Sequence, residues 1–463
     1  MASESGLLRS SAYARMQAES PSEFVPKRVL LGHAAQSSEV DRGNSFWVKA
    51  AVVYESVTGD HVDDATNAVA RDLLLKLAAN CCSKIDSEPR PKGSESDGED
   101  EKTKDETAAK RTSHPDEGTE ENKRVIDAIF LVVGFLPRLH TAVAGGGATS
   151  RDAVDESFKA THMQDIVTDV IKLENQLPIK HLLDVAGHVE AEVRKLAALD
   201  EFKNIEKALK DYRLGFGRQD FDGVIRSFCS YYSPFFSKPP PPTPPASAKD
   251  EQGGAAASVD RTLLDCLHDS VVPQPPSGKE AAGGGGAKGG KTARIPTARG
   301  LRRSGVRLEA AEEGRAVVQF KEETATLRLP ALVYDFKLAT VARNLLAREL
   351  EEQSKPVTRY FQLMNELVEE VGDARILHRA GVVRGGGGSR GANEVHELIK
   401  KIDGYATYPS VFMAMDVQVE KVKAFHDKRM NNFFVRYRPA VIAGSSVVAA
   451  SVVAIVAARK KRG

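Results

Sequence analysis

Residues 163–183 read "MQDIVTDVIKLENQLPIKHLL", and this stretch decides how the chain folds. Apolar residues recur at helical spacing on both sides of Pro178. They are Ile166, Val167, Val170, Ile171 and Leu173 before it, and Leu182, Leu183, Val185, Val189 and Val193 after it. Pro178 removes a backbone donor and hinders a helical conformation in Leu177, so the stretch predicts two helices separated by a break.

The break itself carries three polar side chains, Glu174, Asn175 and Gln176, directly after the apolar face of the first helix. Buried amides must be paired with hydrogen-bond partners. We therefore predict a structural polar network at the break. A recognition surface built from the same three residues is the alternative.

Helical spacing dominates the rest of the 463-residue chain. The run "VIDAIFLVVGFLPR" (125–138) is interrupted by Asp127, Gly134 and Pro137, so we expect the most buried core helix there rather than a membrane span. Further helices are expected over 338–350, 357–371 and 394–430, the last with a break near 404–409. The fold class is therefore mainly α.

Strand patterns occur from about residue 306 to 329. The segments "VRLEA", "AVVQF" and "ATLRL" alternate apolar and polar positions and are separated by short polar turns. They predict a small antiparallel β-sheet.

Long polar or low-complexity segments divide the chain. Between Asp86 and Arg124 there is no large apolar residue, which predicts disorder because such a segment cannot offset its ordering entropy. Proline and glycine runs predict linkers elsewhere. The expected organisation is a variable N-terminal segment (1–45), a helical segment (46–85), a disordered charged linker (86–124), a helical core (125–236), a Pro-rich linker (237–260), a short helix (261–272), a Gly-rich linker (273–293), an α+β continuation (294–438), a transmembrane helix (440–458) and a basic tail (459–463). A further glycine run, 385–388, is expected to be another linker.

The C-terminal stretch "AVIAGSSVVAASVVAIVAA" (440–458) holds no charge, and as a helix it would cover about 28 Å, close to the thickness of the hydrocarbon core. It predicts a single-pass anchor in the lipid bilayer. Near Met1 there is no apolar run of a secretory signal, so we expect residues 1–438 to be cytosolic, at the plasma membrane or an endomembrane. Lys460 and Lys461 also resemble a dilysine retrieval signal, which would require a cytosolic tail.

Small residues recur every four positions in this stretch, a spacing that allows two membrane helices to approach closely. They are Ser446, Ala450, Ala454 and Ala458. A homodimer is one possibility, and composition alone also explains the row.

The net charge of +1 gives the chain no overall field for steering nucleic acid. Seven basic residues nevertheless fall between Ala281 and Leu308 without an acidic one: Lys288, Lys291, Arg294, Arg299, Arg302, Arg303 and Arg307. No aromatic residue interleaves with them, so no nucleic-acid partner is expected. A solvated basic loop is the first interpretation, with contact to lipid or an acidic partner as the alternative.

No motif predicts a reaction. The segment "GGAKGGKT" (285–292) matches a phosphate loop in letters, but neither a preceding strand nor a following helix supports it, so a nucleotide-binding enzyme remains only the alternative. His396 lacks a second His four residues later, and His181 with His188 lack a third ligand. Cys81 and Cys82 are expected to be helix-end residues, with palmitoylation as the alternative. We expect no catalytic residue, metal or cofactor.

The stretch 163–183 resembles the plant family known as domain of unknown function 247, which carries a Leu-Glu-Asn-Gln-Ile/Leu-Pro motif, here Leu173 to Pro178. Four other segments resemble the family in the same order: "TLLDCLHDSVV", "IPTARGLRRSGVRL", "LRLPALVYDFKLATVARNLLARE" and "ELVEEVGDARILHRAGVV". Family members begin with a segment around Ser-Ile-Gly-Pro-Tyr-His-His-Gly, of which "VPKRVLLGHAAQ" (25–36) keeps little.

The resemblance implies a largely helical, membrane-attached plant protein. Some grass members of the family are linked to self-incompatibility, which implies recognition or signalling with an unknown protein partner rather than catalysis.

Overall fold

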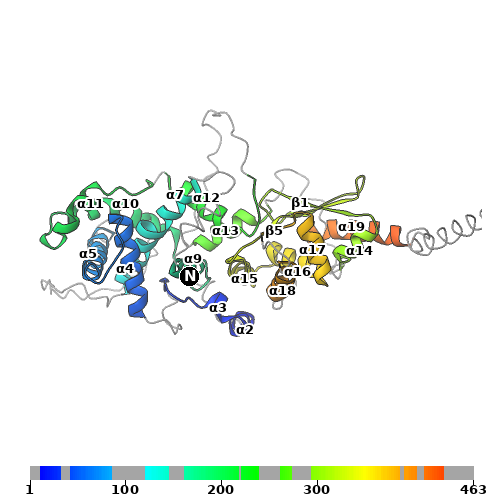
Figure 1. The fold of residues 1–463 in the computed structure, drawn as a ribbon, viewed down its shortest axis with the longest axis horizontal. Coiled ribbons are helices and arrows are strands. Elements are labelled where there is room, and N and C mark those ends of the chain that lie inside the picture. The colour runs from blue at the N-terminus through cyan, green and yellow to red at the C-terminus, as the bar shows by residue number, and fades with distance from the viewer. Residues whose placement is uncertain are drawn as a thin grey trace, which may run out of the picture. The chain divides into compact units, whose positions relative to one another are not determined.

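A computed structural model describes residues 11–32, 42–85, 120–144, 161–217, 220–238, 261–273, 294–385, 391–403 and 411–431 (Figure 1). The chain divides into two compact units, and each is described by itself. The first holds the described residues of Met1–Ser233, Pro239–Ser270 and Ala339–Arg348, and the second those of Pro234–Lys238, Val271–Leu338 and Glu349–Gly463.

All helices and no strands are found among the regular elements described in the first unit. Its elements are α2 (Ser11–Glu19), α3 (Pro21–Phe24), α4 (Arg42–Thr58), α5 (Asn67–Ile85), α6 (Glu120–Ile129), the π-helix η2 (Phe130–Phe135), α7 (Leu136–Ala144), α9 (Thr161–Val170), α10 (Ile179–Leu196), the 3-10 helix η3 (Asp200–Ile205), α11 (Glu206–Asp211), α12 (Phe221–Tyr232), α13 (Leu263–Val271) and α15 (Leu338–Arg348). The two helices predicted around Pro178 are α9 and α10.

The core of this unit is built around α6, η2 and α7, which form one continuous helix. Every residue from Val125 to Leu136 is buried, which confirms the predicted core helix. Among the described residues this is the one helix long and apolar enough to cross a membrane, but 72% of its most apolar window is buried inside the protein. Helices α4, α5 and α10 pack around it (Figure 1).

The π-helical turn lies where α4 approaches most closely. A Cβ at Gly134 would stand 2.8 Å from Cγ1 of Val52. The Gly134 carbonyl also accepts a hydrogen bond from Ser56 Oγ at 3.3 Å. Glycine is therefore required here by close packing rather than by an unusual backbone angle.

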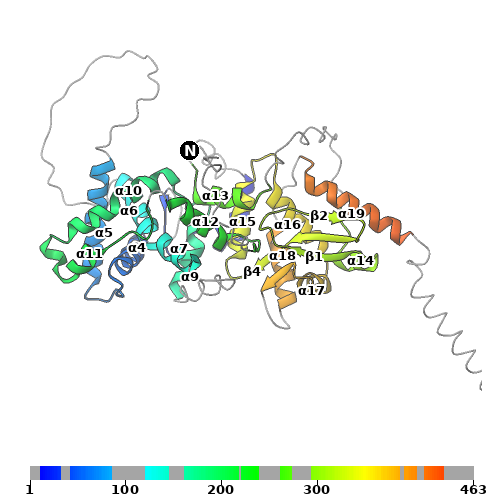
Figure 2. The same ribbon diagram turned by 90° about the horizontal axis from the view of Figure 1, so that it is seen from above.

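The second unit combines helices with short strands. Its helices are α14 (Ala298–Arg303), α16 (Pro356–Leu367), α17 (Val371–Arg379), α18 (Gly391–Asp403) and α19 (Ala414–Met430). Its strands are β1 (Arg307–Ala311), β2 (Gln319–Lys321), β3 (Thr326–Pro330), β4 (Leu332–Tyr334) and β5 (Val383–Gly385). Figure 2 shows the strands beside α14, α16 and α19.

The three strands predicted for 306–329 exist, but their pairing was predicted wrongly. The sheet order is β1-β3-β2, with β1 parallel to β3 and only β2 antiparallel to it. In β3 four of the five residues are buried, whereas β1 and β2 are half exposed, so β3 takes the central place where both of its edges are paired. Alternation along one strand identifies a strand but does not state its neighbour.

A second, two-stranded parallel sheet joins β4 to β5 and was not predicted. Gly385, expected to begin a linker, instead ends β5. Its φ is +91°, and a Cβ there would overlap the carbonyl oxygen of Tyr334, so glycine is required by the strand pairing.

A buried ion pair holds α19 to α16 in this unit. Nε of Arg359 lies 2.7 Å from Oδ1 of Asp416, and both side chains are almost completely buried. Asp416 also accepts a hydrogen bond from the Met413 amide at 2.9 Å, which caps α19. Helix α19 is thus anchored at its start.

Several predictions lie outside the described residues. They concern the membrane helix (440–458), the basic tail (459–463) and most of the predicted linkers 86–124, 237–260 and 273–293. These stay predictions. The helix expected over 394–430 is two helices, α18 and α19, and the expected break at 404–409 falls in an undescribed gap.

Two helical glycines of the first unit provide a matched test of its packing. Gly134→Ala should lower the free energy of unfolding by about 1–3 kcal/mol, because its methyl group must displace Val52 in a filled core. Gly187→Ala on α10 meets no atom within 4 Å and should be neutral or slightly stabilising. Thermal unfolding of both variants checks this, and equal midpoints would contradict the close packing at η2.

Candidate functional site

Helix α9 ends at a sharp turn that the motif Leu173–Pro178 stabilises through its own side chains. In the turn, the backbone N–H of Asn175 donates to the Lys172 carbonyl at 2.9 Å. Nε2 of Gln176 donates to the carbonyls of Val170 and Lys172 at 2.8 and 2.9 Å. The last carbonyls of a helix lack partners within the helix, and the Gln176 side chain supplies one to Val170, the last residue of α9, so Gln176 caps α9.

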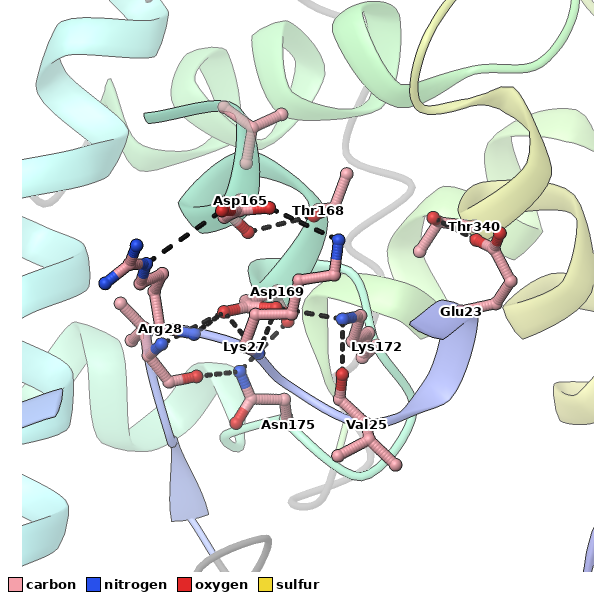
Figure 3. Close-up of polar contacts among 12 residues, drawn as sticks. Glu23, Val25, Lys27, Arg28, Asp165, Thr168, Asp169, Lys172, Asn175 and Thr340 are labelled. Atoms are coloured by element: carbon pink, nitrogen blue, oxygen red, sulfur yellow. Dashed lines mark hydrogen bonds and ion pairs between the residues drawn. The ribbon is translucent and has the colours of Figure 1, made fainter. Parts of the chain in front are cut away.

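Asp169, in the last turn of α9, receives three consecutive backbone amides from a distant segment (Figure 3). Its carboxylate accepts from the amides of Lys27 at 2.9 Å, Arg28 at 2.6 Å and Val29 at 3.0 Å. Successive amides that converge in this way form a small anion-binding concavity. Here its occupant is a side chain of the same protein.

Lys172 neutralises the same carboxylate from the other side. Its Nζ lies 2.9 Å from Oδ1 of Asp169 and donates to the Val25 carbonyl at 2.6 Å. Both charged side chains are fully buried. A buried ion pair is tolerated when additional hydrogen bonds satisfy its remaining groups, and the backbone of residues 25–29 supplies them.

Asn175 continues the same pattern along the segment. Its Oδ1 accepts from the Leu31 amide at 2.5 Å, and its Nδ2 donates to the carbonyls of Val29 at 2.8 Å and Asp169 at 2.9 Å. Asn175 is 1% exposed. Three of its hydrogen-bonding positions are therefore occupied by backbone groups.

A second ion pair holds the end of the segment. Oδ2 of Asp127 accepts from the Gly32 amide at 2.9 Å, and its Oδ1 lies 2.5 Å from Nζ of Lys49. Lys49 also donates to the Leu30 carbonyl at 2.5 Å, and the Leu30 amide donates to Oγ of Ser45 at 2.9 Å. Burial raises the pKa of Asp127, and the Lys49 charge opposes that rise.

We call Asp169, Lys172, Asn175, Asp127 and Lys49 the polar clamp, and residues 25–32 the clamped segment. The hydrogen bonds of the clamp to that segment all go to backbone atoms. The clamp therefore fixes an extended stretch of chain through its backbone.

Other groups of the motif reach further elements of the first unit. Glu174 Oε1 accepts from the hydroxyl of Tyr13 at 3.0 Å and from Gln17 Nε2 at 3.1 Å, both on α2. Gln176 Oε1 accepts from the Leu264 amide of α13 at 3.0 Å. The Leu173 amide donates to Oδ1 of Asn344 on α15 at 2.8 Å. Burial raises the pKa of Glu174, which the hydrogen bonds from α2 partly offset.

These contacts confirm the predicted structural polar network at the break and leave Asn175 no exposed surface for recognition. The sequence patterns did not identify the other four clamp residues or their partner, the clamped segment. A signal existed: Asp127 and Asp169 each stand alone among residues whose spacing predicts burial. A carboxylate in such a position requires a partner.

The remaining candidates from the sequence show no shared site. No group of His, Cys, Asp and Glu in the described ranges could hold a metal ion. Nζ of Lys400, at the position where a zinc-protease helix carries its second His, contacts Oδ1 of Asn365 at 2.5 Å. Burial raises the pKa of the Cys81 thiol to about 12, and Cys82 donates to Oδ1 of Asn122. The segment 285–292 lies outside the described residues.

The geometry defines a class of protein, namely a helical scaffold closed around its own N-terminal segment by a buried polar motif. The family model described as "Plant protein of unknown function", domain of unknown function 247, matches residues 124–457. The chain belongs to this family.

A UPF0481 protein of Arabidopsis thaliana is 34% identical to the chain over 92 residues, which is 19% of this chain and 17% of that relative. The match thus spans less than a fifth of the relative's length. No solved structure matches the chain.

Asp169→Asn tests the clamp directly. The NH₂ group of the asparagine side chain would face backbone N–H groups that now donate to the carboxylate. Lys172 would also keep an unpaired buried charge, which costs about 3–5 kcal/mol. Amide hydrogen exchange at Lys27, Arg28 and Val29 should accelerate by roughly two orders of magnitude or more.

The matched control is Asp165→Asn, four residues earlier on the same helix. Asp165 forms partly exposed ion pairs with Lys27 at 3.3 Å and Arg28 at 3.9 Å, which contribute about 0–1 kcal/mol. Exchange there should change little. Equal acceleration in both variants would show that Asp169 does not hold the segment.

Glu174→Gln tests the electrostatics of the motif. The folded-state pKa of Glu174 is raised above 4.5, so the stability it contributes is complete below that value and is lost as pH rises through the folded pKa. Glutamine keeps an acceptor for Tyr13 and Gln17 but cannot ionise. The variant should therefore lose this decline and be at least as stable as the parent at neutral pH.

The pH control is Glu206→Gln. Lys210 lowers the pKa of Glu206, so the stability from this exposed pair is lost in the opposite direction, as pH falls. Unfolding midpoints are measured at a series of pH values. The difference in midpoint between variant and parent should change with pH in opposite directions for Glu174→Gln and Glu206→Gln. A parallel change would contradict the assigned direction at Glu174.

Proposed function

We propose that the protein is a single-pass, membrane-anchored recognition module that binds another protein and catalyses no reaction in its motif residues. The observation that carries the proposal is the saturation of the polar clamp. The Asp169 carboxylate already accepts three backbone amides and one ammonium group. A general base or metal ligand needs a free lone pair facing a substrate, and this carboxylate offers none.

The membrane part of the proposal rests on residues 440–458. Eight Val and Ile residues there favour insertion by about 2–5 kcal/mol in total, and Arg459, Lys460, Lys461 and Arg462 follow at the end as headgroup contacts. With residues 1–438 on the cytosolic side, the helical units would present their surfaces to cytosolic partners.

The recognition part is supported by the family. Members in grasses are linked to self-incompatibility, a process of recognition between cells. A rigid scaffold suits that task, because a preorganised surface loses less conformational entropy on binding than a flexible one. The clamp supplies such rigidity to the first unit.

Alkaline carbonate extraction of membranes tests the anchor, and protease protection of tags at both ends tests its orientation. The full chain should stay in the membrane pellet with its N-terminal tag digestible from the cytosolic side. Val448→Asp/Val453→Asp should release it, because each aspartate at the centre of a span costs about 2.5–3.5 kcal/mol.

The control is Val411→Asp/Val417→Asp, the same chemical change at two exposed valines of the second unit, which should stay in the pellet. Release of the parent chain by alkali would end the membrane proposal. Binding of ATP by the purified chain, abolished by Lys291→Ala, would favour a nucleotide enzyme over a recognition module.

A further inference from the structure

Two helices of the second unit, α14 and α17, pack against each other and line an open cavity of about 480 Å³. Figure 2 shows both helices beside β1. Five arginines line the cavity: Arg299, Arg302, Arg303, Arg375 and Arg379. The first three belong to the basic run found in the sequence, whereas the last two come from α17, about 70 residues later in the chain.

Most of these charges have no partner within the described part of the chain. Arg299 pairs with Glu370, with Nη1 and Oε2 2.9 Å apart. Arg302, Arg303, Arg375 and Arg379 are exposed and form no ion pair there. No acidic side chain lines the cavity. Like charges held together repel one another, so the cavity concentrates positive potential.

The arrangement is built by specific contacts rather than by loose surface side chains. Oδ1 of the buried Asp373 accepts the Arg299 amide at 2.8 Å, which joins the first turns of α14 and α17. Glu370 and Asp373 form a capping box at the start of α17, and Thr297 caps α14 by accepting the Gly300 amide at 3.2 Å. The two backbones that carry the arginines are thereby fixed to each other.

Gly372 also helps to position an arginine of the cavity. It lines the cavity, and a Cβ at this position would overlap the guanidinium of Arg299. Glycine therefore lets Arg299 lie across the first turn of α17, where its side chain faces the other arginines.

We propose that this cavity, the arginine pocket, binds a small ligand carrying two or more phosphate groups, such as an inositol polyphosphate headgroup. A guanidinium presents two parallel N–H donors that match a phosphate, and four unpaired ones suit at least two phosphates. The volume lies in the range of small-molecule sites. No aromatic side chain lines the pocket, so it lacks the stacking surface that single-stranded nucleic acid uses.

The proposed ligand has two possible sources, because the same phosphorylated headgroup occurs on free inositol phosphates and on phosphoinositide lipids. The proposal for the pocket therefore holds with or without the membrane anchor. Two probes separate these sources. Inositol 1,4,5-trisphosphate is the soluble probe, and a short-chain phosphatidylinositol bisphosphate is the lipid probe. Short-chain phosphatidylserine serves as the anionic lipid without phosphomonoesters.

The experiment is titration calorimetry on the full chain in neutral detergent. We expect saturable binding of at least one phosphorylated inositol probe and none of phosphatidylserine. Arg302→Gln/Arg375→Gln should weaken binding by a hundredfold or so, taking roughly tenfold per charged contact. The charge-matched control Arg307→Gln/Lys321→Gln changes two exposed cations outside the pocket and should bind like the parent.

Gly372→Ala gives an independent reading without any change of charge. Its methyl group should displace only the flexible end of Arg299 and weaken binding several-fold, while the unfolding midpoint stays near that of the parent. Binding of the soluble probe identifies a free ligand, and binding of the lipid probe alone identifies a headgroup in a membrane; both support the pocket. No saturable binding, equal binding of phosphatidylserine, or equal loss in the control pair would overturn the proposal.

Discussion

The convergence of three consecutive backbone amides on the buried Asp169 carboxylate is the constraint on which the first unit depends. A buried carboxylate is costly unless it is paired and hydrogen-bonded, and an extended backbone inside a protein is costly unless its amides find acceptors. Here the carboxylate is the acceptor for the amides, and the amides are the hydrogen-bond donors for the carboxylate. The clamped segment therefore cannot leave without exposing the core to an unpaired Asp169 and Lys172, so a stretch near the N-terminus becomes part of the interior.

The break at Pro178 makes this arrangement possible. In a continuous helix, Glu174, Asn175 and Gln176 would point in three directions around the axis. In the turn, each of the three side chains forms hydrogen bonds with a different part of the unit: Glu174 with α2, Asn175 with the clamped segment and Gln176 with α13. One interruption in hydrophobic periodicity thus organises parts of the chain that are far apart in sequence.

The features that the sequence predicts depend on residues close together in the chain, and those that it misses depend on residues far apart. Helices α9 and α10, the buried run from Val125 to Leu136 and the strand segments follow from spacing within a few residues, and these were found. The sheet order, the β4–β5 pair and the clamp depend on partners up to 147 residues away, and side-chain periodicity carries no information about them. The clamp adds a specific difficulty, since its hydrogen bonds to residues 25–32 reach backbone atoms, which a side-chain pattern does not reveal.

The polar clamp and the arginine pocket differ in how their charges are paired, and this contrast separates structural from functional polarity. In the clamp, the buried carboxylates and ammonium groups are matched by partners, so a substitution there acts through stability. In the arginine pocket, the backbone is fixed by Asp373 and the capping box, yet four guanidinium groups remain unpaired among the described residues. Folding does not require such an array, because like charges in one cavity oppose it. An anion would offset the repulsion within such an array, and we propose that a phosphorylated ligand bound at α14 and α17 supplies it.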